Sequence, residues 1–366
     1  GSIRPAERVY PRSRMAEAEA ITFTFESEGL PGLTIRVGAA RLRERINEPF
    51  VAQMTCVVPE PDADVGQMIG KSGTLTIERG GGALRRVHGI VAEVELGEPP
   101  GANLRGRATW STVTLVPAWW LRGLSRNSRI FQDMTAIEIL EAVLGPALGV
   151  YGRELRVATD ATYPTREYCV QYQESDRDFA QRLIEEERIS YAFDQEGDAE
   201  VLVLRDRNAA HPQTPTQTGA IAIPFQPHDL DISVEEPILE VRHRLKDTTT
   251  SVVVRDWDWS RAEMPFDATQ ASTDARGRDR ESYEHGWGRS AWITDYSGTS
   301  YTAEDTARQI GVRQQALVRD QHTIEVVSRV IGMTPGTRFE LSGHPTPGYD
   351  GEYFIVEVTH HADRER

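Results

Sequence analysis

Two aspartates in the second half of the chain, Asp256 and Asp258, alternate with Trp257 and Trp259. Carboxylates two residues apart on a strand share one face, and tryptophans beside them are typical of surfaces that bind sugars. A glycoside hydrolase needs two carboxyl groups roughly 5 to 10 Å apart across a cleft, and neighbours on one strand lie at the short end of that range. We therefore interpret this segment as a strand end with exposed aspartates and buried tryptophans. A cell-wall glycan hydrolase or a carbohydrate-binding module stays open as an alternative function.

A second candidate motif is the Gly-Lys-Ser at Gly70–Ser72, which also closes a phosphate-binding loop. The first glycine of that loop would stand at position 65, where the chain has Val65. The motif must also open a helix, so that backbone amides and the helix dipole face the phosphates. The strand-like run Thr74–Ile77 follows instead. The pattern predicts a turn and argues against nucleotide binding.

Other residues that could carry chemistry are scattered. His360 and His361 form the one adjacent histidine pair, and on a strand their rings would point to opposite faces, so one metal ion could not easily take both. Cys56 and Cys169 are far apart and share no CxxC spacing, which favours neither a disulfide framework nor a zinc site. The chain has no HExxH and no GxSxG motif. We therefore predict no catalytic, cofactor-binding or metal-binding residue, and a protein that is not an enzyme.

Composition limits the partners. The formal net charge of −15 over 366 residues argues against nucleic acid, because phosphate binding requires clustered cations. No stretch approaches the roughly 18 apolar residues of a membrane span. Residues 1–15 contain four arginines and no apolar core of a secretory signal, and we expect a flexible lead there.

Alternation of apolar and polar residues predicts strands through the first third of the chain. The clearest are 21–25, 33–37, 50–58, 74–78, 84–96 and 108–116, with a hairpin turn at 79–83. Little helix interrupts them, which is typical of a barrel or a sandwich.

Helical spacing appears after Pro117. Thr135 and Glu138 form a capping box, and Gly145 with Pro146 predicts the end of that helix. A strand at 168–172, a helix capped near Ser175 and a hairpin ending at 204 complete a small α+β unit.

The last part of the chain again favours strands. The Pro- and Thr-rich segment 208–227 predicts a linker, and 265–290 predicts a long loop. A helix is expected from Thr302 to about Val318. Strands are expected at 238–245, 250–257, 323–331, 337–341 and 352–359, the last two joined by a hairpin turn at 349–351.

Three stretches of sequence are specific enough to indicate a protein family. The first is Leu115–Leu121 (LVPAWWL) followed by Asn127–Gln132 (NSRIFQ). The second is Tyr168–Asp176 (YCVQYQESD), which continues to Tyr191. The third consists of Gly343–Pro345, Gly351–Tyr353 and Val358–His361, and Arg86–Val91 adds a weaker match. Together they resemble the N-terminal region of the VgrG family, the tip proteins of type VI secretion systems. Arg188 departs from the family pattern, which usually has glycine at this position. We expect the helix from Ser175 to end within two residues of Glu187. If the helix ends there, Arg188 should have a positive φ.

The resemblance implies an α+β, mainly β fold with two tail-tube-like β-barrels and an α+β insert. The implied domains are 16–118 for the first barrel, 119–212 for the insert and 213–366 for the second barrel. It further implies a homotrimer that adapts a hexameric Hcp tube to a threefold spike, since two equivalent barrels in each of three chains present six surfaces.

Partners beyond the tube follow from the same resemblance. Baseplate proteins and effector or adaptor proteins are expected to bind, whereas a PAAR tip protein would bind through a C-terminal spike that lies outside these 366 residues. The family is assembled in the bacterial cytoplasm and then secreted or injected into the extracellular space or a target cell. The resulting hypothesis is a structural hub of a contractile injection machine, with the hub of a phage tail or of an extracellular injection particle as a close alternative.

Overall fold

The computed structural model describes most of the chain, with gaps. The described residues are 21–60, 62–79, 82–97, 109–207, 211–227, 236–246, 251–256, 266–271, 281–285, 315–316, 319 and 321–363. They form two compact units, which are described separately. The first unit holds the described residues up to Leu115 except Leu42–Ala52, together with the end of the last strand, and the second unit holds Leu42–Ala52 and Val116–His360.

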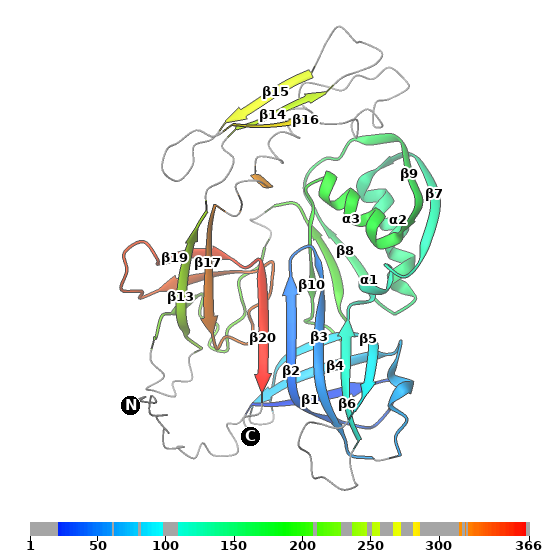
Figure 1. Ribbon diagram of the computed structural model, residues 1–366, viewed down its shortest axis with the longest axis vertical. Helices are drawn as coiled ribbons and strands as arrows, with labels where there is room; N and C mark the ends of the chain where they lie inside the picture. Colours follow the sequence, from blue (N-terminus) through cyan, green and yellow to red (C-terminus); the bar gives the residue numbers. More distant parts are fainter. Residues whose placement is uncertain are drawn as a thin grey trace, which may run out of the picture. The chain divides into compact units, whose positions relative to one another are not determined.

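A closed β-barrel dominates the first unit (Figure 1). Its six strands are β1 (Ile21–Ser27), β2 (Ile35–Arg45), β3 (Glu48–Val58), β4 (Ser72–Arg79), β5 (Gly82–Leu96) and β6 (Thr109–Val116). The sheet runs in the order β1-β4-β5-β6-β3-β2, and β2 pairs with β1 to close the ring, while β20 (Glu357–Asp363) adds to the outer edge of β2. These strands confirm the predicted β character of the first third of the chain, including the β4–β5 hairpin.

The alternating apolar residues of the barrel strands point inward. Phe25 pairs in register with Ile35 on β2 and with Leu75 on β4, and all three side chains are buried. Gly73 makes room for the Phe25 ring, because a Cβ at that position would lie 2.6 Å from it. The barrel interior is therefore filled by side chains rather than open as a pore.

A turn, not a helix, surrounds the Gly-Lys-Ser motif. The short 3-10 helix η2 (Val65–Met68) ends before it, Gly70 has a φ of 75°, and β4 begins at Ser72. The Gly70 amide donates to the Val91 carbonyl. The predicted turn is confirmed, and the geometry lacks the helix N-terminus that a phosphate site of this type requires.

The second unit begins with an α+β region (Figure 1). Its elements are α1 (Ala118–Leu121), β7 (Arg126–Thr135), α2 (Ala136–Gly149), β8 (Glu154–Ala158), β9 (Thr165–Ser175), α3 (Asp176–Glu186), β10 (Ser190–Asp194) and β11 (Val201–Arg205). β7 and β9 form a two-stranded antiparallel sheet, and β10-β11-β8 form a second sheet. The predicted α+β character is confirmed, and we call residues 119–212 the insert, of which the structure describes 119–207 and 211–212.

Helix α2 begins as predicted and ends later than predicted. The Thr135 hydroxyl accepts from the Glu138 amide, and the Glu138 carboxylate accepts from the Thr135 amide. The predicted stop at Pro146 is wrong, because the helix continues to Gly149. Gly145 has no Cβ to clash with the proline ring, so the helical conformation before Pro146 costs less. Continuation also buries Ala147 and Leu148.

Helix α3 ends where the sequence predicts. Glu187 caps it, the Ile189 amide donates to the Ile184 carbonyl, and Arg188 follows with a φ of 60°. This arrangement resembles the helix stop that usually has glycine in the left-handed position. Arg188 therefore adopts a backbone conformation that costs a non-glycine residue on the order of 1 kcal/mol.

The rest of the second unit has small sheets around one core. They are β12-β18-β19, formed by Ala222–Pro224, Arg338–Ser342 and Gly351–Phe354, and β13-β17, formed by Ile238–Leu245 and His322–Ser328. Their shared core contains Ile223, Ile238, Val330, Met333, Phe339, Leu341 and Ile355. We call these strands the second β region.

Three predictions for the second β region need correction. The expected linker 208–227 pairs with β18 through Gln213 and contributes β12, since its backbone hydrogen-bonds to that strand. The expected strand 352–359 is divided into β19 and β20 at Ile355, whose amide donates to Thr337. The expected loop 265–290 contains β15 (Phe266–Ala271) and β16 (Glu281–His285), which flank β14 (Ser251–Asp256).

Some predictions lie outside the described residues. These are the flexible lead 1–15, the side chains of Asp256 to Trp259, and most of the helix expected between Thr302 and Val318.

Candidate functional site

The residues first considered for chemistry are only partly described by the structure. Asp256 is the last residue of β14, and Asp258 lies outside the described residues. His360 lies within 2.9 Å of the Met333 carbonyl and 3.8 Å of the Glu44 carboxylate, while His361 is exposed.

Within the described part of the chain, no group of three or more histidine, cysteine, aspartate or glutamate side chains could hold a metal ion. Both cysteines are buried and unpaired, and burial raises the pKa of the Cys56 thiol to about 12. Burial also raises the pKa of Cys169. A thiol with a raised pKa is a poor nucleophile. No helix among the described residues is long and apolar enough to cross a membrane.

The start of the insert is fixed by a buried ion pair. Arg153 donates to the Glu200 carboxylate, which also accepts from the Ala118 amide at 3.0 Å. Next to it, the Trp119 indole donates to the Tyr191 hydroxyl at 3.3 Å, and burial raises the pKa of Tyr191. Ala118 and Trp119 of the Leu115–Leu121 stretch therefore hold the start of the insert in place.

The turn between β2 and β3 contacts Tyr191 within the second unit. Asn47 has a φ of 62°, its amide donates to the Tyr191 carbonyl, and its side-chain oxygen accepts from the Tyr191 amide at 2.7 Å. Phe193 lies edge-on to both Tyr191 and Phe50, with ring centroids 6.0 Å and 5.3 Å away. Aromatic contacts of this kind stabilise by about 0.5–1.5 kcal/mol each beyond the area that they bury.

The inner face of the β7–β9 sheet is covered by helices. Phe131 of β7 stacks on Phe179 of α3, with centroids 5.6 Å apart. Gln171 of β9 donates to the Asp176 carboxylate, which also accepts from Asn127. These buried contacts fix which residues of β7 and β9 point outward.

The outer face of the same sheet carries several exposed apolar residues. Tyr172 is 70% exposed, Ile130 is 61% exposed and Tyr168 is 48% exposed. Ile130 lies directly across from the half-buried Val170 in the antiparallel register. We call Ile130, Tyr168, Val170 and Tyr172 the insert surface. Uncharged aromatic and aliphatic residues are enriched in the cores of protein–protein interfaces, so this surface is a candidate binding site.

The sequence alone did not identify the insert surface. Alternation of Tyr168, Val170 and Tyr172 predicted the strand, but alternation shows only that the three share a face. Helices α2 and α3 cover the opposite face of the sheet. No residue pattern within β9 predicts which of its two faces the helices cover.

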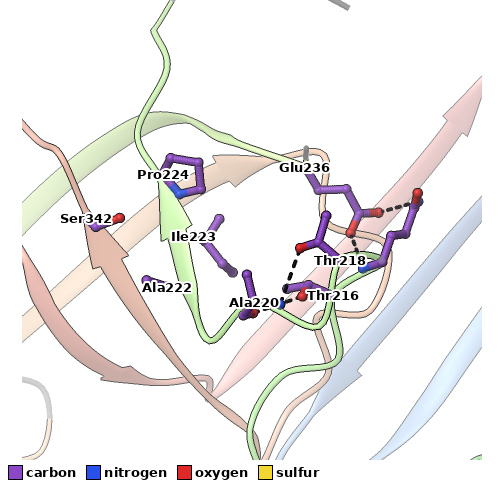
Figure 2. A pocket seen from close by; sticks show the side chains of 9 residues that line it. Thr216, Thr218, Ala220, Ala222, Ile223, Pro224, Glu236 and Ser342 are labelled. Atoms are coloured by element: carbon purple, nitrogen blue, oxygen red, sulfur yellow. Dashed lines mark hydrogen bonds between the residues drawn. The ribbon is translucent and has the colours of Figure 1, made fainter. Parts of the chain in front are cut away.

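A shallow pocket of about 260 Å³ lies in the second β region (Figure 2). Figure 2 shows Glu236 beside Thr216 and Thr218 at its edge, with Ile223 and Pro224 of β12 on the opposite side. The Glu236 carboxylate already accepts from the Gln217 amide and side chain and from the Ile331 amide. Its charge therefore stabilises the loop, and the pocket offers few free polar groups for a ligand.

Comparison with known proteins supports an assembly role. The family model described as phage tail baseplate hub (GPD) matches residues 43–365. The type VI secretion system spike protein VgrG1b of Pseudomonas aeruginosa is 28% identical over 323 residues, covering 88% of this chain and 41% of that protein. The chain thus spans less than half the length of this relative.

Two solved structures share the fold. The E. coli c3393 protein, described as a type VI secretion component similar to phage T4 tail proteins, has 18% identity and a TM-score of 0.63, covering 93% of this chain and 73% of that one. A 43 kDa tail protein of prophage MuSo2 from Shewanella oneidensis has 14% identity and a TM-score of 0.61, covering 94% and 95%.

Proposed function

This chain belongs to the phage tail baseplate hub (GPD) family, and on that basis we propose that it is a structural hub subunit of a contractile injection machine of the type VI class. In this role three copies form a ring at the base of the spike, and the ring binds the end of a hexameric Hcp tube. The protein is assembled in the cytoplasm and leaves the cell with the spike. Its role is mechanical, and we propose that it is not an enzyme.

The closed barrel is the observation that carries this proposal. A threefold ring can match a sixfold tube only if each chain presents two equivalent surfaces. Strands β1 to β6 supply one closed barrel, and the second β region supplies the strands from which a second barrel would be built. We propose the domains 16–118, 119–212 and 213–366 for the first barrel, the insert and the second barrel.

Binding to the tube protein tests the proposal. Purified chain is mixed with Hcp rings, and the mass of the complex is measured by sedimentation velocity. We expect three chains on one hexameric ring. A chain that fails to bind rings under conditions in which the rings themselves stack would contradict the hub role. A monomer in the absence of rings decides nothing, because the chain spans 41% of the length of a spike relative.

We further propose that the insert surface binds a baseplate protein. Phe131, on the opposite face, packs against α3 of the same insert, so Ile130, Tyr168 and Tyr172 are free to contact a partner. An uncharged centre of this kind excludes water well when a complementary protein surface covers it.

A triple variant separates the two partners. Ile130→Ser, Tyr168→Ser and Tyr172→Ser together remove the apolar surface without touching the buried face of the sheet. We expect Hcp binding to be unchanged and recruitment to the assembled baseplate to be lost. Val150→Ser is the matched control, because Val150 is 76% exposed and lies outside the sheet. Full recruitment of the triple variant would refute the insert surface as the baseplate contact.

The glycan hydrolase alternative is not supported by the family or by the fold neighbours. Assay of the chain on purified peptidoglycan tests it directly, with Asp256→Asn as the control. We expect no lytic activity above background. Activity that Asp256→Asn removes while the fold stays intact would contradict the structural role.

A further inference from the structure

Four rings from three segments of the second β region lie in one row. His243 of β13 stacks on Tyr349, with centroids 3.6 Å apart and planes 22° apart, and Tyr349 in turn stacks on His344 at 4.6 Å. At the other end, His243 Nδ1 and His322 Nε2 of β17 share a hydrogen bond of 2.9 Å. We call His322, His243, Tyr349 and His344 the His–Tyr stack. It joins the β13–β17 sheet to the loop between β18 and β19.

Each hydrogen bond of the stack requires a ring nitrogen that carries no proton. The Thr346 amide donates to His344 Nδ1 at 3.0 Å, so this nitrogen carries a lone pair and not a proton. The bond between His243 and His322 likewise needs one nitrogen with a lone pair. Full protonation of the three rings therefore removes both acceptors and places like charges within one row.

Among the described residues, the charged groups near the stack make other contacts. Burial, followed by the nearby His322 and His344, lowers the pKa of His243. Asp350 is the carboxylate of the loop, and its two oxygens accept from the Gly343 and His344 amides. Tyr353 lies edge-on to His243 and donates its hydroxyl proton to the Tyr349 carbonyl. The described strands beside the stack carry the ion pairs Arg242–Glu240, Arg244–Glu325 and Arg338–Glu352, and Glu340 of β18 is exposed.

We propose that the His–Tyr stack is a pH-sensitive clamp, which holds the 343–350 loop against the β13–β17 sheet at neutral pH and releases it in mild acid. Protonation breaks the Thr346–His344 and His243–His322 bonds, and repulsion between the imidazolium rings separates the stack. The loop retains its Asp350 contacts, so release is local rather than global.

Hydrogen exchange of the whole chain tests the clamp. Protection of peptides covering residues 343–354 is measured at pH 7.5 and 5.5, after correction for the intrinsic pH dependence of exchange. We expect protection to fall by about tenfold at the lower pH, the size of effect that loss of one or two hydrogen bonds produces. Peptides from the barrel of the first unit serve as the internal reference and should change little.

Two variants remove the titration in different ways. His243→Phe keeps an aromatic ring on Tyr349, and His322→Gln keeps a polar group near His243 without an imidazole. Both should reduce the pH response of the loop, whereas His361→Gln, an exposed histidine of β20, should leave it unchanged. If His243→Phe fails to fold, the pH response of the His322→Gln variant alone tests the clamp. Unchanged protection of the wild-type loop between the two pH values, or a full pH response in both variants, would overturn the clamp.

Discussion

The two units of the chain stabilise themselves by different means. The barrel of the first unit is filled by apolar side chains such as Phe25, Ile35 and Met54. The first unit also buries the polar residues Ser27, His88 and Ser111, whereas the second unit buries charged residues in addition to its apolar core: Arg153, Arg166, Asp176, Glu187 and Glu200 are all less than a tenth exposed, as are Gln171 and His211. Apolar burial depends little on pH, whereas buried charges and histidines are costly once a partner is lost or a proton is gained. The difference therefore predicts where single changes and acid act most strongly.

Substitution of Phe25 by alanine tests the apolar side of this comparison. Phe25 is fully buried between β2 and β4, and removal of such a ring costs about 3–5 kcal/mol. We expect loss of hydrogen-exchange protection in β1, β4 and β5. Ile21→Ala, at an exposed end of β1, is the matched control and should cost less than about 1 kcal/mol. Equal effects of the two substitutions would show that the barrel interior is not the stabilising core.

Substitution of Glu200 by alanine tests the ionic side. It leaves the buried Arg153 guanidinium and the Ala118 amide without their acceptor, which costs about 3–5 kcal/mol for a buried pair. Arg156→Ala is the control, because Arg156 pairs with Asp194 at the surface and such pairs contribute about 0–1 kcal/mol. Urea unfolding, monitored by hydrogen exchange of insert peptides, measures the loss of stability in both variants. A loss below about 1 kcal/mol for Glu200→Ala would refute the buried pair as a determinant of stability.

Mild acid should weaken the second unit through His211. Burial is the main reason that the pKa of His211 is lowered, with Arg205 and Arg338 acting in the same direction. The unfolded chain therefore binds this proton at a higher pH than the folded chain does, and stability falls as pH drops through about 6.5. We expect a lower urea midpoint for the second unit at pH 5.5 than at pH 7.5. His211→Phe should shrink that difference, and an unchanged difference would assign the effect to other groups.

Replacement of Arg188 by glycine should have the smallest effect, with the opposite sign. A glycine at φ 60° relieves the left-handed strain, which is about 1 kcal/mol. Arg188→Ala removes the same side chain without relieving the strain, so the difference between the two variants isolates the backbone contribution. We expect the glycine variant to be the more stable of the two in urea. A glycine variant no more stable than the alanine variant would show that the turn carries no strain.

Local signals made much of the fold predictable. The capping box at Thr135 and the end of α3 before Arg188 depend on residues within one or two turns, so the sequence specified them correctly. Alternation around Phe25 likewise predicted the barrel strands. Closure of the barrel depends on the pairing of β1 with β2, and it was implied by the family resemblance rather than by any residue pattern.

Predictions failed where distant residues decide the conformation. The Pro- and Thr-rich segment before β12 resembles a linker in composition, yet Thr214 hydrogen-bonds to Thr337 and to the Arg338 carbonyl, more than a hundred positions away. Composition reports the residues that a segment contains, not the strand that is available to pair with them. The insert surface was missed for a related reason. Tertiary packing of the helices decides which face of β9 is covered, and the residues of β9 do not indicate that face.

Closure of the barrel also determines how the chain tolerates truncation and fusion. Strand β1 pairs along its whole length with β4 and only through Thr24 and Phe25 with β2, so it is the element that completes the ring. A deletion of β1 would open the cylinder and leave β4 without its partner on that side, and exposed strand edges recruit other chains into aggregates. A tag or reporter joined before Ile21 leaves every pairing of the ring in place. A truncated or tagged form of this protein should therefore keep all seven residues of β1.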